Sequence, residues 1–422
     1  MNTSTKKGKG LGEYMPLAFA AGIGSMLGSG IIVGLSATIV VWQEGLGLDT
    51  TQVGLLSGIL TFAIAFGSLF GGRLADKIGR VLFFNWINLF YAIGAAICVF
   101  APNFTVLLIG LIIAGLASGA DLPVSMTIVS HDAPDEATAA QLVSTTQVFW
   151  QVGVFISFIC AFLVSAMQGA TGGRVVFAIL AVFAVIAWLW RLLSPTFRRF
   201  HEAADVRDAA RPAVVGNGKV SVTKVLFGAD KKVLLTYFLA IVIFYVGWNL
   251  LANTWGQFQT YMFSKAGAAQ SLATGLGIIL NFVTLVLNIV FASIAGGKYR
   301  NKAFFAGIVI SLIAMAAMAM GGANLWVIVG ATAFMNLGSP LAGEALYKVW
   351  TQESFPIEIR ASIQGFINGF SRLCCGLFAL ITPALVLPET IQTTMWCFFG
   401  IVIIEGIAGT IMIRAQKKYG TD

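Results

Sequence analysis

Long apolar segments, separated by short polar ones, run along almost the whole chain. Each apolar segment holds about 20 residues or more, which is the length that an α-helix needs to cross the roughly 30 Å hydrocarbon core of a bilayer. The pattern therefore predicts an all-α membrane protein with twelve transmembrane helices. The predicted spans are 15–42, 52–71, 81–101, 104–130, 138–167, 172–194, 233–262, 268–295, 302–321, 324–351, 361–385 and 391–414.

One polar segment, 195–232, is much longer than the others and leaves six predicted helices on each side. We therefore predict an N-terminal six-helix bundle over residues 1–194, a cytoplasmic linker over 195–232 and a C-terminal six-helix bundle over 233–422. Within the linker, the sequence HEAADVRDAA predicts a short surface helix, and PAVVGNGKV is typical of a flexible segment.

The two halves of the chain resemble each other weakly. GGRLADKIGR after the second predicted helix has a counterpart, GGKYRNKAFF, after the eighth, which keeps the glycines and the basic residues but not the acid. Pro134 and Pro356 follow the fourth and tenth predicted helices in comparable places. Two related bundles with a binding site between them are a known transporter architecture.

Composition and charge support a membrane location. The chain is 58% hydrophobic and 10% charged, with a mean hydropathy of +0.87, which leaves too little polar surface for a soluble protein of 422 residues. All but four of the 26 Lys and Arg residues fall on one side of the predicted membrane. Arg191 is counted among the residues of that side. Because basic residues are retained in the cytoplasm, we predict a multi-pass protein of the inner (plasma) membrane with both termini cytoplasmic. This topology accounts for the net charge of +8, so no nucleic-acid partner is predicted.

Other classes of protein are disfavoured by the residues that carry their chemistry. The five cysteines lie in apolar segments without the spacing of metal ligands, so we predict no metal site and no cofactor. No Ser-His-Asp set, HExxH motif or phosphate-binding loop is apparent, and the chain is not predicted to be an enzyme.

The segment after the second predicted helix has the form G-x-L-A-D-x-x-G-R. Its glycines permit a tight turn, and its acid can cap a helix and pair with a nearby arginine. This pattern resembles the signature of the major facilitator superfamily, which implies a fold of two six-helix bundles that rock against each other. We predict a gate formed by Gly72, Arg73, Asp76, Gly79 and Arg80, together with Glu353 and Arg360 near the tenth predicted helix.

Within that superfamily, WTQESFPIEIRA at 350–361 is similar to a stretch of the sugar porters, and Gln147 and Asn253 match sugar-binding positions of those proteins. The resemblance implies a secondary active transporter that moves a sugar or polyol by alternating access. The chain also departs from the sugar porters, since Gly247 and Trp248 replace their glutamine pair and the first predicted helix has no acid. A standard hexose pocket is therefore not expected.

Four ionisable residues inside predicted helices are singled out as candidates: Asp121, Glu344, Lys348 and Arg372. A charge at bilayer depth is expensive and should face a cavity or a partner. Glu344 and Lys348 are four residues apart on one helix face, so they can form an ion pair, which we predict either as a structural contact or as part of a functional site. We predict proton coupling through Asp121 or Glu344, although a neutral, hydrogen-bonded Asp121 is the structural alternative. Arg372 can hold Glu344 or bind an acidic solute.

Hydroxyl-rich ligands are bound by amide side chains and aromatic ring faces. The predicted substrate-binding residues are Gln147, Gln151, Asn249, Asn253, Asn281, Tyr347 and Arg372.

The resulting prediction is a secondary active transporter of a small polar solute, either a sugar or a polyol, by proton-coupled symport. Its expected partners are the solute, protons and the lipid bilayer, and a monomer is expected. Arg372 and Lys348 suggest a carboxylated solute as the alternative. A membrane receptor or sensor on a transporter scaffold is the alternative of another class.

Overall fold

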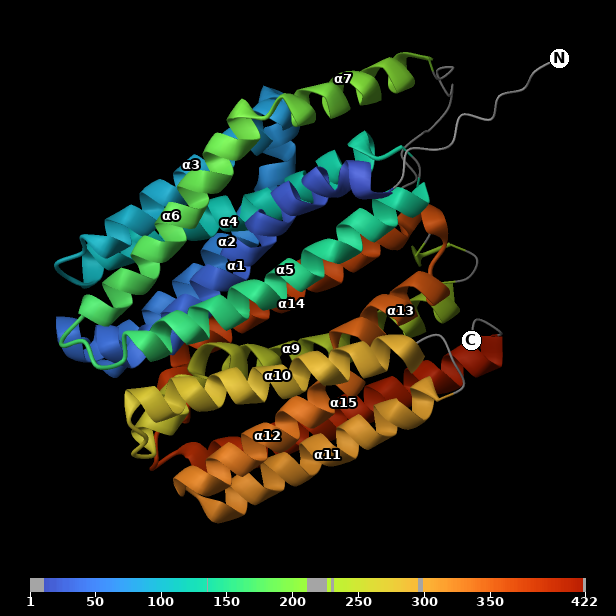
Figure 1. The fold of residues 1–422 in the computed structure, drawn as a ribbon. Coiled ribbons are helices and arrows are strands. Elements are labelled where there is room, and N and C mark those ends of the chain that lie inside the picture. The colour runs from blue at the N-terminus through green and yellow to red at the C-terminus, as the bar shows by residue number, and fades with distance from the viewer. Residues whose placement is uncertain (1–10, 135, 211–225, 229–230, 295–298, 420–422) are drawn as a thin grey trace.

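The computed structural model describes residues 11–134, 136–210, 226–228, 231–294 and 299–419. Helices make up the regular structure of this part of the chain, and they form two neighbouring bundles (Figure 1). The N-terminal bundle and the linker contain α1 (Leu11–Leu46), α2 (Thr50–Ile78), α3 (Arg80–Val99), α4 (Phe104–Asp132), α5 (Glu136–Leu163), α6 (Thr171–Leu193) and α7 (Pro195–Ala210). The C-terminal bundle contains α9 (Lys231–Lys265), α10 (Gln270–Ile294), α11 (Arg300–Gly321), α12 (Leu325–Leu341), α13 (Glu344–Ser354), α14 (Ile357–Leu385) and α15 (Ile391–Tyr419).

The predicted set of twelve membrane crossings is confirmed. In the described part of the chain, eleven helical spans are long and apolar enough to cross a bilayer. One of these, Leu325–Thr351, combines α12 with α13. The twelfth crossing is α5, whose apolar stretch Val148–Leu163 is shorter. The predicted surface helix of the linker is confirmed as α7, whereas the predicted flexible segment lies outside the described residues.

The prediction of one continuous helix over 324–351 is wrong. Helix α12 ends at Leu341, and α13 begins at Glu344. Pro340 lacks the N–H group of a helical residue. Gly343 then adopts φ −142° and ψ −146°, which is not a helical conformation. The tenth crossing is therefore a broken helix.

Both bundles have the same two ends. Helix α1 begins and α15 ends on the side where α7 also lies, which we call the terminal end (Figure 1). The α1–α2 connection lies at the opposite end, which we call the loop end. Helix starts at the loop end are fixed by side-chain caps: Asp49 and Gln52 form a capping box for α2, and Asn103 and Asn324 accept from backbone N–H groups of α4 and α12.

The GGRLADKIGR segment forms a very tight connection between α2 and α3. Helix α2 runs to Ile78, α3 begins at Arg80, and Gly79 alone separates them. Its φ of +103° lies in the region that favours glycine. The backbone conformation of this turn therefore explains why the segment has a glycine at position 79.

Candidate functional site

A cavity of about 340 Å³ lies between the two bundles. Helices α1, α2 and α5 line it from one side, and α9, α10 and α12–α14 line it from the other. Its volume falls within the range of roughly 300–1,000 Å³ that is typical of small-molecule sites.

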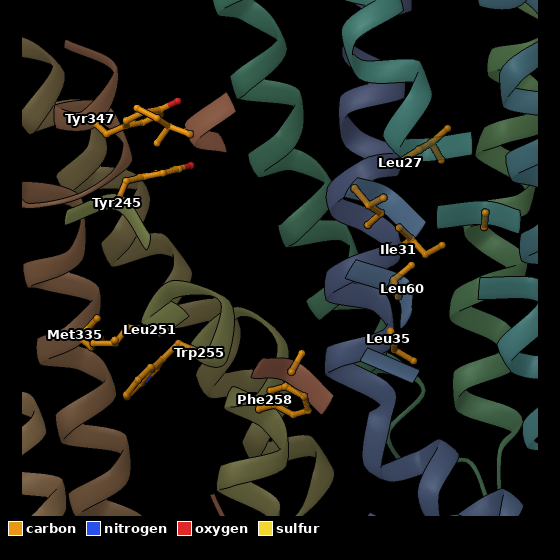
Figure 2. Close-up of a cluster of buried hydrophobic side chains, with 14 of the residues drawn as sticks. Leu27, Ile31, Leu35, Leu60, Tyr245, Leu251, Trp255, Phe258, Met335 and Tyr347 are labelled. Atoms are coloured by element: carbon orange, nitrogen blue, oxygen red, sulfur yellow. The ribbon is translucent and has the colours of Figure 1, made fainter. Parts of the chain in front are cut away.

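Aromatic rings form one wall of the cavity. Tyr245 and Trp248 on α9 line it, with their rings stacked at 5.7 Å between centroids. Trp248 Nε1 donates to Ser339 Oγ on α12 at 2.9 Å, which fixes the indole. The ring of Tyr347 stacks on that of Tyr245, with 3.9 Å between the ring centroids (Figure 2). Tyr347, a predicted ligand, is buried and donates to the Gln364 carbonyl at 2.7 Å, so it supports the wall rather than lining the cavity.

Amide side chains form the polar part of the lining, and the structure brings four predicted residues together here: Gln151, Asn249, Asn253 and Asn281. Asn249 Nδ2 donates to Ser371 Oγ at 2.9 Å, and Asn281 Nδ2 donates to the Gly277 carbonyl at 2.8 Å. In both side chains the amide oxygen is left for a ligand. The side chain of Gln147 lies outside the described residues.

Glu344 and Arg372 also line the cavity, as their predicted depth requires. Lys348 Nζ lies 2.9 Å from Glu344 Oε1, and the two side chains are 41% and 46% exposed, so this ion pair is not sealed within the packed interior. Arg372 Nε donates to Asn368 Oδ1 at 3.3 Å. That contact leaves both terminal nitrogens of the guanidinium for another partner.

Contacts between the bundles close the loop-end side of the cavity. Gln257 Nε2 on α9 donates to Thr61 Oγ1 on α2 at 2.8 Å, and Gln270 Nε2 on α10 donates to the Ala37 carbonyl on α1 at 2.5 Å. At Gly54 the backbones of α2 and α14 come so close that a β-carbon would lie 2.2 Å from the Leu380 carbonyl oxygen.

Asp121 lies outside the cavity lining and forms a buried ion pair with Arg191 of α6. Arg191 Nη1 lies 2.6 Å from Asp121 Oδ1, and Nη2 lies 3.1 Å from Oδ2. The same guanidinium donates to the carbonyls of Phe84 and Ala20, at 3.0 and 2.8 Å. Arg191, which was counted among the basic residues of the cytoplasmic side, lies in the last turn of α6, but its guanidinium does not face solvent. The residue is 1% exposed and joins α1, α3, α4 and α6.

The predicted gating residues lie toward the terminal end of their helices. Gly72 is in α2 and Arg80 begins α3, whereas the side chains of Arg73, Asp76 and Arg360 lie outside the described residues. Glu353, at the end of α13, forms an ion pair with Arg300, which begins α11: Arg300 Nη1 lies 2.5 Å from Glu353 Oε1. Gln416 Nε2 donates to the other carboxylate oxygen at 3.0 Å.

Two further ionisable residues, Arg191 and Glu405, are buried within the helices and were not predicted to be. Arg191 is three residues from the end of the predicted helix 172–194, where the count of basic residues favoured a loop position. Glu405 interrupts the apolar run of the last predicted helix and is 3% exposed. Glu405 could have been predicted from the sequence, because it is an acid inside an apolar segment. Arg191 could have been predicted only as the counter-charge that a buried Asp121 needs.

The chain is similar to known proteins that are transporters. The chain is 30% identical over 407 residues to the minor myo-inositol transporter IolF of Bacillus subtilis (strain 168), with 93% of this chain and 89% of that protein covered. It is 32% identical over 154 residues to the niacin transporter NiaP of Acinetobacter baylyi, covering 36% and 34% of the two chains. The crystal structure of a D-xylose-proton symporter superposes with a TM-score of 0.74 at 14% identity, over 93% of this chain and 96% of that chain.

The sequence pattern of the Major Facilitator Superfamily matches residues 17–379, which include most of both bundles. The resemblance seen in G-x-L-A-D-x-x-G-R thus extends to the whole fold. The chain belongs to the Major Facilitator Superfamily of membrane transporters.

Proposed function

We propose that the protein is a secondary active transporter of a small, neutral, hydroxyl-rich solute, namely a polyol such as an inositol or a sugar. The observation that carries this proposal is the lining of the cavity, where amide groups with free polar atoms face stacked aromatic rings. Such groups bind hydroxyls through hydrogen bonds and the apolar face of the solute through ring contacts. The similarity to a myo-inositol transporter over most of both chains supports the same class of solute.

The contacts between the bundles support alternating access as part of this proposal. They close the loop-end side of the cavity in the described residues, which fits a state that faces the terminal end. We further propose that the terminal end is cytoplasmic, that the membrane is the plasma membrane and that the protein acts as a monomer. In this scheme 195–232 links the bundles 1–194 and 233–422, and the GGRLADKIGR turn, Glu353 and Arg360 form the gate on the cytoplasmic side.

Counterflow in proteoliposomes tests the function directly. Vesicles loaded with unlabelled myo-inositol or another polyol should accumulate the labelled solute from outside. Asn249→Ala and Asn281→Ala should each weaken solute binding, because each removes an amide oxygen that faces the cavity. Asn103→Ala, which affects a helix cap at the loop end, is the control. Absence of counterflow across polyols, sugars and their acids would contradict transport and favour a receptor.

Proton coupling through Glu344 or Asp121 is part of the proposal. Glu344 lines the cavity and can exchange protons with its water. Asp121 pairs with Arg191, which also contacts α1 and α3, so this acid is connected to three other helices. Glu344→Gln and Asp121→Asn are compared with Glu389→Gln, an exposed acid of the last loop. If both variants retain full uphill uptake driven by a pH gradient, the assignment of coupling to these two residues is wrong.

A second candidate solute is an organic anion such as a sugar acid. The observation in its favour is Arg372, whose terminal nitrogens are free for the bidentate binding of a carboxylate. The partial similarity to a transporter of niacin, which is a carboxylic acid, agrees with it.

Competition between a polyol and its acid separates the two candidates. If the solute is an anion, the acid should compete better in the wild type, and Arg372→Ala should abolish competition by the acid while leaving that by the polyol. If Arg372→Ala leaves the ranking of the two solutes unchanged, the anion candidate is wrong.

A further inference from the structure

Glu405 is a carboxylic residue in the middle of the last membrane-spanning helix, and neither the cavity nor the proposed coupling pairs include it. It lies midway between Ile391 and Tyr419, so about 21 Å of helix separates it from either end of α15. The residue is 3% exposed. Protein therefore encloses the carboxyl group, far along the helix from both of its ends.

The surroundings of Glu405 provide no counter-charge. Its Oε1 is buried without a hydrogen-bond partner. From α9 the facing residue is Gly247, where a β-carbon would lie 3.0 Å from that oxygen. From α11, Ile308 and Phe304 approach the following residues of α15, at Gly406 and Gly409. None of these neighbours titrates.

An isolated carboxylate in apolar surroundings takes up a proton rather than remaining ionised. The acid form of Glu405 is thus the form that this conformation favours. Any movement that admits water to the side chain favours the ionised form instead. The protonation state and the local packing are therefore linked.

The helix that covers Glu405 is also a wall of the cavity. Gly247 lies between Tyr245 and Trp248 in sequence, and both of these rings line the cavity. Because Gly247 has no side chain, the α9 backbone sits directly against the acid. A shift of α9 changes the covering of Glu405 and the placement of the two rings together.

We propose that Glu405 is a positioning residue that carries a proton in this conformation and releases it when α9 moves away from α15. The O–H bond of the acid breaks, the proton passes to water, and the carboxylate is hydrated; the reverse step takes the proton back from water. The protonation state of Glu405 then biases the position of α9 and of its cavity rings. An effect of Glu405 on transport rests on the proposed transport function. The protonation of Glu405 in this conformation does not depend on that function.

Infrared spectroscopy of the purified protein tests the protonation without transport. At neutral pH, the wild-type spectrum should contain a carboxylic-acid C=O band that is missing from Glu405→Gln and present in Glu389→Gln. Glutamine keeps the shape of the protonated acid, so the fold should be retained. If wild type and Glu405→Gln have the same intensity in this band, Glu405 is ionised and the proposal is overturned.

Counterflow as a function of pH tests the effect on α9. Glu405→Gln should bind solute like the wild type, while the ratio of its exchange rates at alkaline and neutral pH should differ from the wild-type ratio by at least about threefold. Glu405→Asp, which still titrates, should restore pH dependence. If the wild type exchanges solute and Glu405→Gln has the same pH profile, the positioning role is wrong. If the wild type does not exchange any solute, the proposed function has failed, and the infrared result alone decides whether Glu405 is protonated.

Discussion

At the scale of single residues, the ion pair of Asp121 and Arg191 is the most demanding feature of the N-terminal bundle. Both side chains are almost fully buried, and each is the other's counter-charge. Removing one partner leaves the other charge buried and unpaired, which typically costs about 3–5 kcal/mol. Asp121→Asn and Arg191→Met should therefore each lower the free energy of unfolding by about that amount, measured by denaturant unfolding in detergent.

The double variant Asp121→Asn/Arg191→Met is the control for this prediction. It removes both charges, so it should be clearly more stable than the single variant Arg191→Met. A double variant as unstable as the sum of the two single effects would show that the loss comes from packing and not from unpaired charge.

Gly24 tests the same pair from the side of α1. A β-carbon at this position would lie 1.7 Å from Asp121 Oδ2 and 2.8 Å from Arg191 Nη2. Gly24→Ala should therefore displace the pair and destabilise the protein by about 1–3 kcal/mol. Gly400→Ala, on α15 with nothing within 4 Å of the added carbon, should be neutral or slightly stabilising. Equal melting temperatures for the two variants would contradict this account.

The sequence predicted single residues unevenly. Asn249, Asn253, Asn281 and Gln151 were predicted as ligands because amide groups bind hydroxyl-rich solutes, and all four line one cavity. The buried pairing of Arg191 was not predicted, because a basic residue near a helix end is usually a topology signal. Its partner lies 70 positions earlier in the chain, and a pairing of that kind follows from how α4 and α6 pack, which the local pattern does not contain.

At the scale of elements, the break between α12 and α13 is the feature that the hydrophobic pattern cannot show. The apolar length continues across it, so the pattern predicts one helix over 324–351. The break depends on two residues, Pro340 and Gly343. It brings the Ser339 carbonyl within 3.3 Å of Trp248 Nε1 and thereby holds a ring of the cavity.

Gly343→Ala tests the role of this break. A β-carbon at Gly343 would lie 2.3 Å from the Ser339 carbonyl oxygen and 2.6 Å from Trp248 Nε1. The indole must then move, so we expect weaker solute binding together with a loss of stability of about 1–3 kcal/mol. Solute-dependent thermal stabilisation measures the binding. Gly330→Ala, on α12 with open space around the added carbon, should bind solute like the wild type. Unchanged binding by Gly343→Ala would mean that the break does not position Trp248.

At the scale of the whole molecule, two bundles and twelve crossings could be predicted from the sequence because apolar length and the long linker determine them. The relative placement of the bundles could not. It depends on contacts between helices far apart in the chain, such as α2 with α14 and α1 with α9, and a transporter must have more than one such arrangement.

Gly54 tests which arrangement the loop-end contacts stabilise. A β-carbon there would lie 2.2 Å from the Leu380 carbonyl oxygen, so Gly54→Ala should prevent the close approach of α2 and α14. At a cost of about 1–3 kcal/mol, the population of this conformation should fall roughly five- to 150-fold relative to one in which the bundles separate at the loop end. Gly67→Ala is a matched control, because on the same helix it creates an equally close contact, 2.2 Å from the Leu116 carbonyl oxygen, inside the N-terminal bundle.

Thiol labelling measures the shift. Asn288 lines the cavity on α10, toward the terminal end of that helix, and Asn288→Cys in a variant without the native cysteines reports access from that end. Labelling should slow in Gly54→Ala, because the cavity then spends less time open to the terminal end. Gly67→Ala should lower the melting temperature and leave the labelling rate near that of the parent. A Gly54→Ala protein that labels as fast as its parent would show that the contact of α2 with α14 does not select this conformation, and the assignment of the open side would then have to rest on Gln257 and Gln270 alone.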